Sequence, residues 1–184
     1  MAHEVRIIGG QWKRTKLAVA DRPGLRPTPD RVRETLFNWL GQDLTGWRCL
    51  DAFAGTGALG FEAASRGAQE VTLVEHDAAL VTQLKRVQTQ LQASATQIVR
   101  GDGVASLKHQ NPGSLDLVFI DPPFDSAQFE AALQSAARAV TAEGFVYLEA
   151  PVRWTDEPLA LLGLAVYRHL KAGAVHAHLL TRLA

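Results

Sequence analysis

The chain has 184 residues, of which 47% are hydrophobic and 21% are charged. This composition is typical of a globular protein with a full hydrophobic core, and the length suits one domain. It excludes an intrinsically disordered chain, and the presence of one cysteine excludes an internal disulfide framework.

The amino-terminal residues carry no apolar run typical of a signal peptide. No segment reaches the roughly 20 apolar residues that a membrane-spanning helix needs. We therefore expect a cytoplasmic protein that does not act at a membrane.

The formal charge of the chain is zero, but the charges are unevenly distributed. Between residues 6 and 33 there are eight basic and two acidic side chains, a net charge of +6, which leaves −6 for the remainder. A basic segment on an acidic body indicates that a polyanion binds at one edge of the molecule.

The first 47 residues predict a small extension before the main domain. Val5–Ile8 and Lys16–Val19 predict a two-stranded β-ribbon. Residues 21–29 are dense in proline and glycine and predict an extended loop. Asp30 is expected to cap a helix over residues 31–40, whose apolar residues recur at helical spacing.

From residue 48 onward, apolar strand segments alternate with helical segments. The expected strands are 49–53, 71–74, 97–99, 115–120 and 145–148, and the expected helices are 58–66, 78–91, 104–108 and 127–140. This alternation predicts right-handed crossovers and a mostly parallel sheet that is covered on both faces.

The carboxyl-terminal segments 165–170 and 175–180 are joined by a short turn and predict an antiparallel hairpin. A parallel sheet that ends in such a hairpin is typical of the Rossmann-like class I methyltransferases that use S-adenosylmethionine. We therefore expect an α/β fold in one methyltransferase domain, residues 1–184. It would consist of a basic amino-terminal ribbon and helix extension, 1–47, and a Rossmann-like core, 48–184.

A glycine loop, DAFAGTGALG at residues 51–60, leads from the first core strand into a helix. Gly55, Gly57 and Gly60 satisfy the G-x-G-x-x-G pattern, and Glu75 lies at the end of the next strand. These features alone also fit a dinucleotide site. However, Asp51 would repel a pyrophosphate, whereas it would attract the amino group of a methionine moiety.

The sequence Asp121-Pro122-Pro123-Phe124 follows the fourth expected strand, at the edge of the sheet where ligands bind in α/β folds. The two prolines hold the backbone extended and fix the directions of the Asp121 carboxylate and the Pro122 carbonyl. Two such acceptors can draw the nitrogen of an aromatic amine towards tetrahedral geometry and free its lone pair for attack. Phe124 would provide a surface on which an unstacked base can lie.

Together, three parts of the chain resemble the bacterial 16S ribosomal RNA guanine-N2 methyltransferases of the RsmD type. They are the loop at 51–57, the Asp121–Phe124 motif, and the pair RIIGG at 6–10 and LRPTPDRVRETLFN at 25–38. The resemblance covers nearly the whole chain. It implies S-adenosyl-L-methionine as the cofactor and, as the target, the guanine that the family name numbers 966. The implied partner is 16S rRNA in 30S ribosomal subunits or their assembly intermediates.

The resemblance also implies roles for individual residues. The catalytic residues would be Asp121, Pro122, Pro123 and Phe124. The cofactor would be bound by Thr28, Asp51, Phe53, Ala54, Gly55, Thr56, Gly57, Glu75, His76, Asp102 and Gly103. The candidate RNA-binding residues are Arg6, Lys13, Arg14, Arg26, Arg31 and Arg33.

Three alternatives stay open at this point. An adenine-N6 methyltransferase acting on DNA or RNA would share the Asp121–Phe124 motif, although no target-recognition insertion is visible after it. An NAD-binding oxidoreductase is disfavoured by Asp51 and the double proline. A non-catalytic ribosome-assembly factor would not need the intact motifs. We expect a monomer, and the histidines and the cysteine do not form a metal-binding pattern.

Overall fold

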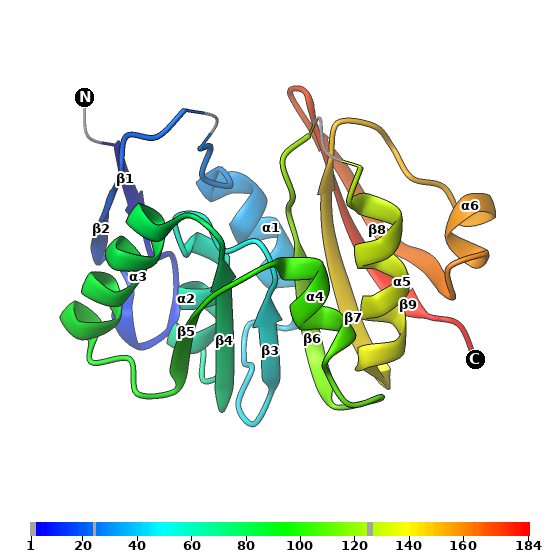
Figure 1. Cartoon of the computed structure of the whole chain (residues 1–184), viewed down its shortest axis with the longest axis horizontal. Coiled ribbons are helices and arrows are strands. Elements are labelled where there is room, and N and C mark those ends of the chain that lie inside the picture. Colours follow the sequence, from blue (N-terminus) through cyan, green and yellow to red (C-terminus); the bar gives the residue numbers. More distant parts are fainter. Residues whose placement is uncertain (1–2, 24, 125–126) are drawn as a thin grey trace.

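The computed structural model describes residues 3–23, 25–124 and 127–184 and is built around one seven-stranded sheet (Figure 1). The strand order is β5-β4-β3-β6-β7-β9-β8. The strands are β3 (Arg48–Asp51), β4 (Glu70–Glu75), β5 (Thr96–Arg100), β6 (Leu115–Ile120), β7 (Val140–Ala150), β8 (Leu164–Ala172) and β9 (Val175–Arg182). The first five are parallel, and β9 runs antiparallel to both β7 and β8. The expected sheet plan is confirmed.

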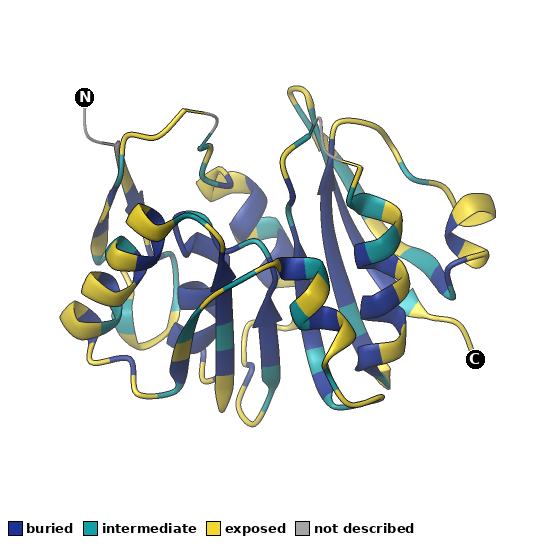
Figure 2. Cartoon of the chain, in the orientation of Figure 1, coloured by how far each residue is buried: buried dark blue, intermediate teal, exposed yellow. Residues whose placement is uncertain are grey.

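Helices cover both faces of the sheet, and each face has its own core. Successive residues of a strand point to opposite faces. On β6, Leu117 and Phe119 accordingly belong to one cluster, and Val118 and Ile120 to the other. The first cluster packs under α1 (Asp30–Leu40), α2 (Ala58–Ser65) and α3 (Ala78–Leu91); the second packs under α4 (Gly103–Lys108), α5 (Phe129–Ala139) and α6 (Asp156–Ala160). Figure 2 shows the central strands as the most continuously buried part of the molecule.

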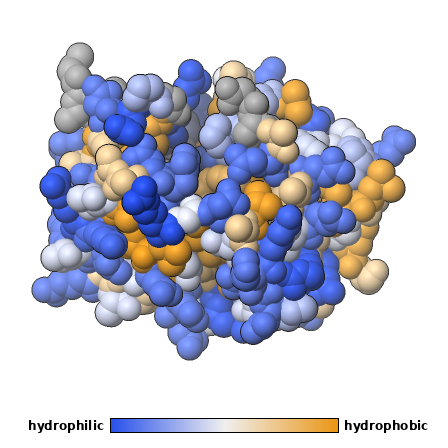
Figure 3. Space-filling model, viewed as in Figure 1, coloured by the Kyte–Doolittle hydropathy of each residue, from blue (hydrophilic) through white to orange (hydrophobic). Residues whose placement is uncertain are grey.

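The surface is mostly hydrophilic on the face that Figure 3 shows, with hydrophobic residues gathered between the polar ones. Among the described residues no helix is long and apolar enough to cross a membrane.

The amino-terminal ribbon is formed by β1 (His3–Arg6) and β2 (Lys16–Val19), with a short 3₁₀ helix, η1 (Gly10–Trp12), between them. The expected ribbon is therefore confirmed, but its first strand ends two residues earlier than the sequence predicts. Past Arg6, the backbone N–H groups of Ile8 and Gly9 donate to the Glu62 carboxylate of α2 and not to β2.

Three details differ from the expectations. Asp30 does not cap α1 but is its first residue, and its carboxylate pairs with Arg33 one turn later. Strand β7 is longer than the predicted 145–148 because β6 and β9 both pair with it. The short helix α6 lacks an apolar periodicity long enough to be recognised in the sequence.

A buried ion cluster joins the amino-terminal extension to the core. Glu62 of α2 is fully buried, and its two oxygens accept hydrogen bonds from Ile8 N at 2.9 Å and Gly9 N at 3.0 Å. The same carboxylate pairs with Arg33 of α1 at 3.1 Å and with Arg66 at 2.9 Å. Arg33 also donates to the backbone oxygens of Thr28 and Arg6. The carboxylate thus holds the ribbon, the loop before α1 and α1 itself against α2.

We predict that Glu62→Gln destabilises the protein by about 3 kcal/mol or more, because it leaves buried arginine charge without its partner. Chemical denaturation measures this free energy of unfolding. Glu70→Gln is the matched control, since Glu70 is exposed on β4, and it should lie within about 0.5 kcal/mol of the wild type. Equal stabilities of the two variants would contradict the role assigned to the cluster.

Candidate functional site

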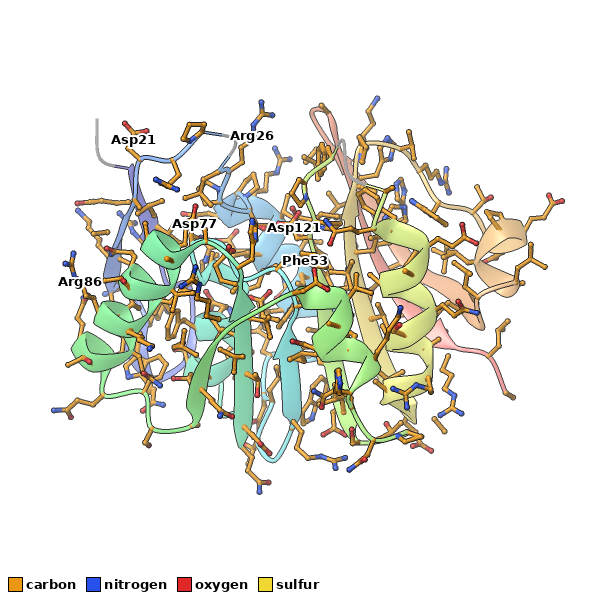
Figure 4. All side chains as sticks on the ribbon, viewed as in Figure 1. Asp21, Arg26, Phe53, Asp77, Arg86 and Asp121 are labelled. Carbon is orange, nitrogen blue, oxygen red and sulfur yellow. The ribbon has the colours of Figure 1, made fainter. Side chains whose placement is uncertain are left out.

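The carboxyl ends of β3, β4 and β6 and the loops that follow them form the candidate site. Figure 4 shows Phe53, Asp77 and Asp121 around the upper ends of the central strands, with Arg26 above them in this view. Parallel strands bring their carboxyl ends to one edge, so residues far apart in sequence meet there.

The glycine loop between β3 and α2 needs glycine for its backbone path. Gly55 and Gly57 have φ angles of 54° and 83°, in the region that side chains disfavour. A Cβ at Gly57 would lie 2.6 Å from the ring of Phe61, so the helix could not pack as it does. Gly57 is the residue before the first turn of α2, and its N–H donates to Ala54 O at 2.8 Å.

Ala54, Thr56 and Phe53 complete this loop. Ala54 is buried, and its N–H donates to Val74 O on β4 at 2.9 Å. The buried Thr56 hydroxyl accepts from Ala58 N at the start of α2. Phe53 is only partly buried and packs against the apolar cluster on the opposite face. The loop is therefore held on both sides.

Asp51, the last residue of β3, carries an unsatisfied charge-bearing atom. Its carboxylate is almost fully buried, and Oδ2 accepts from Gly60 N at 3.1 Å. Within the described part of the chain, Oδ1 has no hydrogen-bond partner. Burial, with the nearby Glu75 and Glu149 charges, raises the pKa of Asp51 to about 7. A buried carboxylate oxygen without a donor is costly, and a bound cation would satisfy it.

Glu75 supports the glycine loop from the end of β4. Its Oε1 accepts from Gly55 N at 3.0 Å and its Oε2 from Asp77 N at 2.9 Å. Each carboxylate oxygen has a second lone pair, so both remain able to accept a further hydroxyl. His76 lies beside it, with Nδ1 3.2 Å from Glu75 Oε2 and its side chain 81% exposed.

Asp102 and Gly103 form the start of α4. The exposed Asp102 carboxylate caps this helix by accepting from Ala105 N at 2.8 Å. Gly103 is buried, and a Cβ there would lie 2.3 Å from Ala52 O. Because that neighbour is backbone, the residue has to be glycine for α4 to approach the loop after β3 this closely.

The Asp121–Phe124 motif continues directly from β6. Asp121 is partly exposed, Pro122 is buried, Pro123 is exposed and Phe124 is half-buried. Desolvation, followed by the neighbouring carboxyl of Glu149, raises the pKa of Asp121 well above its ordinary value. Because β6 pairs with β3, the motif leaves the sheet beside the point where the glycine loop leaves β3.

The loop before α1 lies over the glycine loop. The Cδ1 atom of Leu25 is 3.3 Å from the position of a Cβ at Gly55. Arg22 forms a salt bridge with Asp77, the residue that caps α3 just after Glu75. Thr28 is buried, and its backbone oxygen accepts from Arg33. Gly24 of this loop lies outside the described residues.

The predicted RNA-binding residues fall into three groups. Arg6, Arg26 and Arg31 are exposed, and Arg26 lies above the site in Figure 4. Lys13 and Arg14 are also exposed. They follow Trp12, whose backbone N–H donates to the Ser65 hydroxyl at the far end of α2, so they lie away from the glycine loop. Arg33 is a correction: its side chain is 1% exposed and is occupied by Glu62 and Asp30.

Sequence reasoning missed Glu62, Arg22 and Asp77 as residues that hold the site together. Asp77 stands at a recognisable helix-capping position, so its local role had a signal. Its partner Arg22 is 55 residues away in sequence, and no pattern of spacing connects the two. Among the described residues no group of three or more His, Cys, Asp or Glu side chains could hold a metal ion.

The fold and this site define the class of the protein. A parallel sheet with an antiparallel final hairpin, a glycine loop after β3 and an acidic residue ending β4 are the architecture of class I methyltransferases.

A model of the family described as "Conserved hypothetical protein 95" matches residues 5–181. "Ribosomal RNA small subunit methyltransferase D" of Escherichia coli (strain K12) is 40% identical over 181 residues, which cover 97% of this chain and 90% of that protein. The Haemophilus influenzae protein of the same name is 40% identical over 178 residues, 90% of this chain and 92% of its own. The solved structure "Putative methyltransferase yhhF from Escherichia coli" has a TM-score of 0.85 at 40% identity and 99% coverage of both chains. The chain belongs to this family, and the resemblance to the RsmD type is confirmed.

We predict that Asp51→Asn stabilises the protein at pH 8. The pKa of Asp51 is raised from 3.8 to about 7, so between these values the folded state binds more protons than the unfolded state. The free energy of unfolding therefore falls as pH rises from about 4 to about 7. Removing the charge should raise the free energy of unfolding by on the order of a few kcal/mol above pH 7 and should not change it below pH 4.

Thermal denaturation between pH 4 and pH 8 measures this difference. Glu157→Gln, on the exposed surface of α6, is the control and should follow the wild type at every pH. If the stabilities of the wild type and Asp51→Asn differ by the same amount at every pH, the pKa of Asp51 is not elevated.

Proposed function

We propose that this protein transfers a methyl group from S-adenosyl-L-methionine to the exocyclic N2 amine of a guanine in 16S rRNA. The guanine would be the one numbered 966, within 30S particles or their assembly intermediates. The observation that carries the proposal is the meeting of the Asp121–Phe124 motif with a buried carboxylate, Asp51, that has an unpaired oxygen within the described chain. The names of the relatives, which are small-subunit rRNA methyltransferases, support the rRNA substrate.

The residues at the carboxyl edge suit the cofactor. Asp51 Oδ1 would accept from the amino group of the methionine moiety, Glu75 from the ribose hydroxyls, and His76 would lie alongside. Asp102 and Gly103 would border the adenine, while Thr28 and its loop cover the site. Phe53, Ala54, Gly55, Thr56 and Gly57 would line the methionine side. The cofactor supplies an electrophilic methyl group on a positively charged sulfur, which the nearby carboxylates favour electrostatically.

The target amine would be held by the motif after β6. Asp121 and the Pro122 carbonyl would accept its N–H groups, and Phe124 would stack on the base. Because the prolines leave this backbone little freedom, the acceptors are oriented before the base arrives, which lowers the entropic part of the barrier. A guanine inside a base stack cannot bring its amine to these acceptors, so the base must be unstacked to reach the motif.

The exposed arginines support a nucleic-acid partner. Arg6, Arg26 and Arg31 carry charges on the amino-terminal extension, which the Glu62 cluster fixes next to the site. We assign phosphate contacts near the site to Arg26 and Arg31, and contacts further along the RNA to Arg6, Lys13 and Arg14. We take the protein to act as a cytoplasmic monomer.

The test is transfer of labelled methyl from S-adenosylmethionine to 30S subunits that lack their natural methylations, followed by nucleoside analysis. We expect label in N2-methylguanosine at one site. Asp121→Ala should reduce transfer by at least a hundredfold and leave the Kd for S-adenosylmethionine nearly unchanged.

Two results would contradict the proposal. Label in N6-methyladenosine would identify an adenine-N6 enzyme with the same motif, and loss of cofactor binding in Asp121→Ala would place Asp121 in the cofactor site. The control Glu157→Gln should transfer methyl at the wild-type rate, because Glu157 is exposed on α6.

A further inference from the structure

Strands β6 and β7 bring two carboxyl groups together at the candidate site. In their parallel register Phe119 lies beside Tyr147 and Ile120 beside Leu148. The next positions with side chains on the Phe119 and Tyr147 face are Asp121 and Glu149, because side chains alternate along a strand. The rings of Phe119 and Tyr147 are in edge contact, 6.2 Å between centroids, below the two acids.

Glu149 is buried and fixed by its neighbours. Its side chain is 4% exposed, and the fully buried Tyr147 hydroxyl donates to Glu149 Oε1 at 2.7 Å. The register places the Glu149 carboxyl beside Asp121, and its charge, after desolvation, is the main cause that raises the pKa of Asp121. Two buried carboxyl groups held side by side favour a state in which one of them carries a proton. The geometry therefore suits a pair that shares one proton.

The surroundings of the pair contain no compensating base. Within the described residues, no Lys, Arg or His nitrogen lies within 4.0 Å of either carboxyl group. The titratable groups that face the pair are Asp51 from β3 and Tyr147 from β7, and both are acids. Two like charges this close cannot both ionise readily. A buried glutamate in such a place is costly for stability and points to a role in the reaction.

The proposed reaction needs a group that takes up a proton. When the nitrogen–carbon bond forms, the sulfur–carbon bond breaks and the electron pair stays on sulfur, which becomes a neutral thioether. The positive charge passes to the methylated amine, which must then lose one proton. Asp121 is the acid next to that amine in the proposed arrangement.

We infer that Glu149, oriented by Tyr147, is a positioning residue that holds Asp121 in a proton-sharing pair, and that this pair receives the proton that the amine loses. Before transfer the pair carries one negative charge, so the free lone pairs of Asp121 accept the amine N–H groups. After transfer the pair carries the additional proton and is neutral. The inference rests on the proposed function for its chemical step, whereas the shared proton is a property of the protein without cofactor or RNA.

The first experiment measures the titration of the carboxyl pair and involves no methyl transfer. Carboxyl carbon NMR of protein labelled with ¹³C aspartate and glutamate follows the Asp121 titration with neither cofactor nor RNA present. In Glu149→Gln, removal of the neighbouring charge should lower the Asp121 midpoint by about one pH unit or more. In Tyr147→Phe, Glu149 loses its hydroxyl donor and takes more of the shared proton, so the Asp121 midpoint should also fall. Midpoints that stay unchanged in both variants would show that the two carboxyl groups do not share a proton and would overturn the inference.

The second experiment measures single-turnover methyl transfer to 30S subunits as a function of pH. Glu149→Gln should slow transfer about tenfold or more at neutral pH. It should also move the acidic limb of the profile to lower pH and leave the Kd for S-adenosylmethionine unchanged. Glu143→Gln, on the exposed part of the same strand, should match the wild type. A Glu149→Gln profile that superimposes on the wild type after scaling would overturn the proton role.

The two failures are distinguishable. If the wild type transfers no methyl to RNA but the NMR midpoints shift as stated, the proposed function is wrong and the carboxyl pair stands. If transfer occurs and the midpoints do not move, the function stands and Glu149 has no part in it.

Discussion

The arrangement of this protein depends on one buried carboxylate, Glu62. The amino-terminal extension also packs apolar side chains into the core beside α2 and bonds to Ser65, but Glu62 is the one charge that contacts the ribbon and α1 together. The carboxylate accepts from two backbone N–H groups after β1 and pairs with Arg33 of α1 and with Arg66, the residue after α2. A charge that is buried in this way is stable only when all its partners are in place. The extension and the core therefore adopt one relative position, which sets the loop before α1 over the glycine loop.

The carboxyl edge of the sheet has a different electrostatic character from the extension beside it. Three acidic side chains lie at the carboxyl ends of the neighbouring strands β3, β6 and β7: Asp51, Asp121 and Glu149. Among the described residues no basic side chain forms a salt bridge with them, and burial raises the pKa of Asp51 to about 7. Such a cluster is unfavourable for the protein alone and favourable for a positively charged ligand. Outside it, the exposed arginines face solvent. Acidic side chains at the sheet edge thus lie close to exposed arginines of the amino-terminal extension, an arrangement that would suit the cationic cofactor and the polyanion of the proposed function.

Sequence patterns predicted the sheet, the hairpin and the motif loops because these depend on local spacing and alternation. The helix 78–91 and the strand 115–120 were predicted with their observed bounds. The pairings of Glu62 with Arg33 and of Arg22 with Asp77 were not predictable, since they join residues 29 and 55 positions apart through tertiary packing. For the same reason Arg33 was wrongly grouped with the exposed arginines. The net charge of residues 6–33 is larger than the charge that this segment exposes, because Arg33 is buried and pairs with Asp30 and Glu62.

The most direct test of this account is an experimental structure of the protein with S-adenosylhomocysteine. The account predicts that the α-amino nitrogen of the ligand lies about 2.7–2.9 Å from Asp51 Oδ1, with the ribose hydroxyls on Glu75 and the sulfur facing Asp121. A ligand whose amino group points to solvent while Asp51 Oδ1 stays without a donor would contradict it. So would a ligand bound at the opposite edge of the sheet.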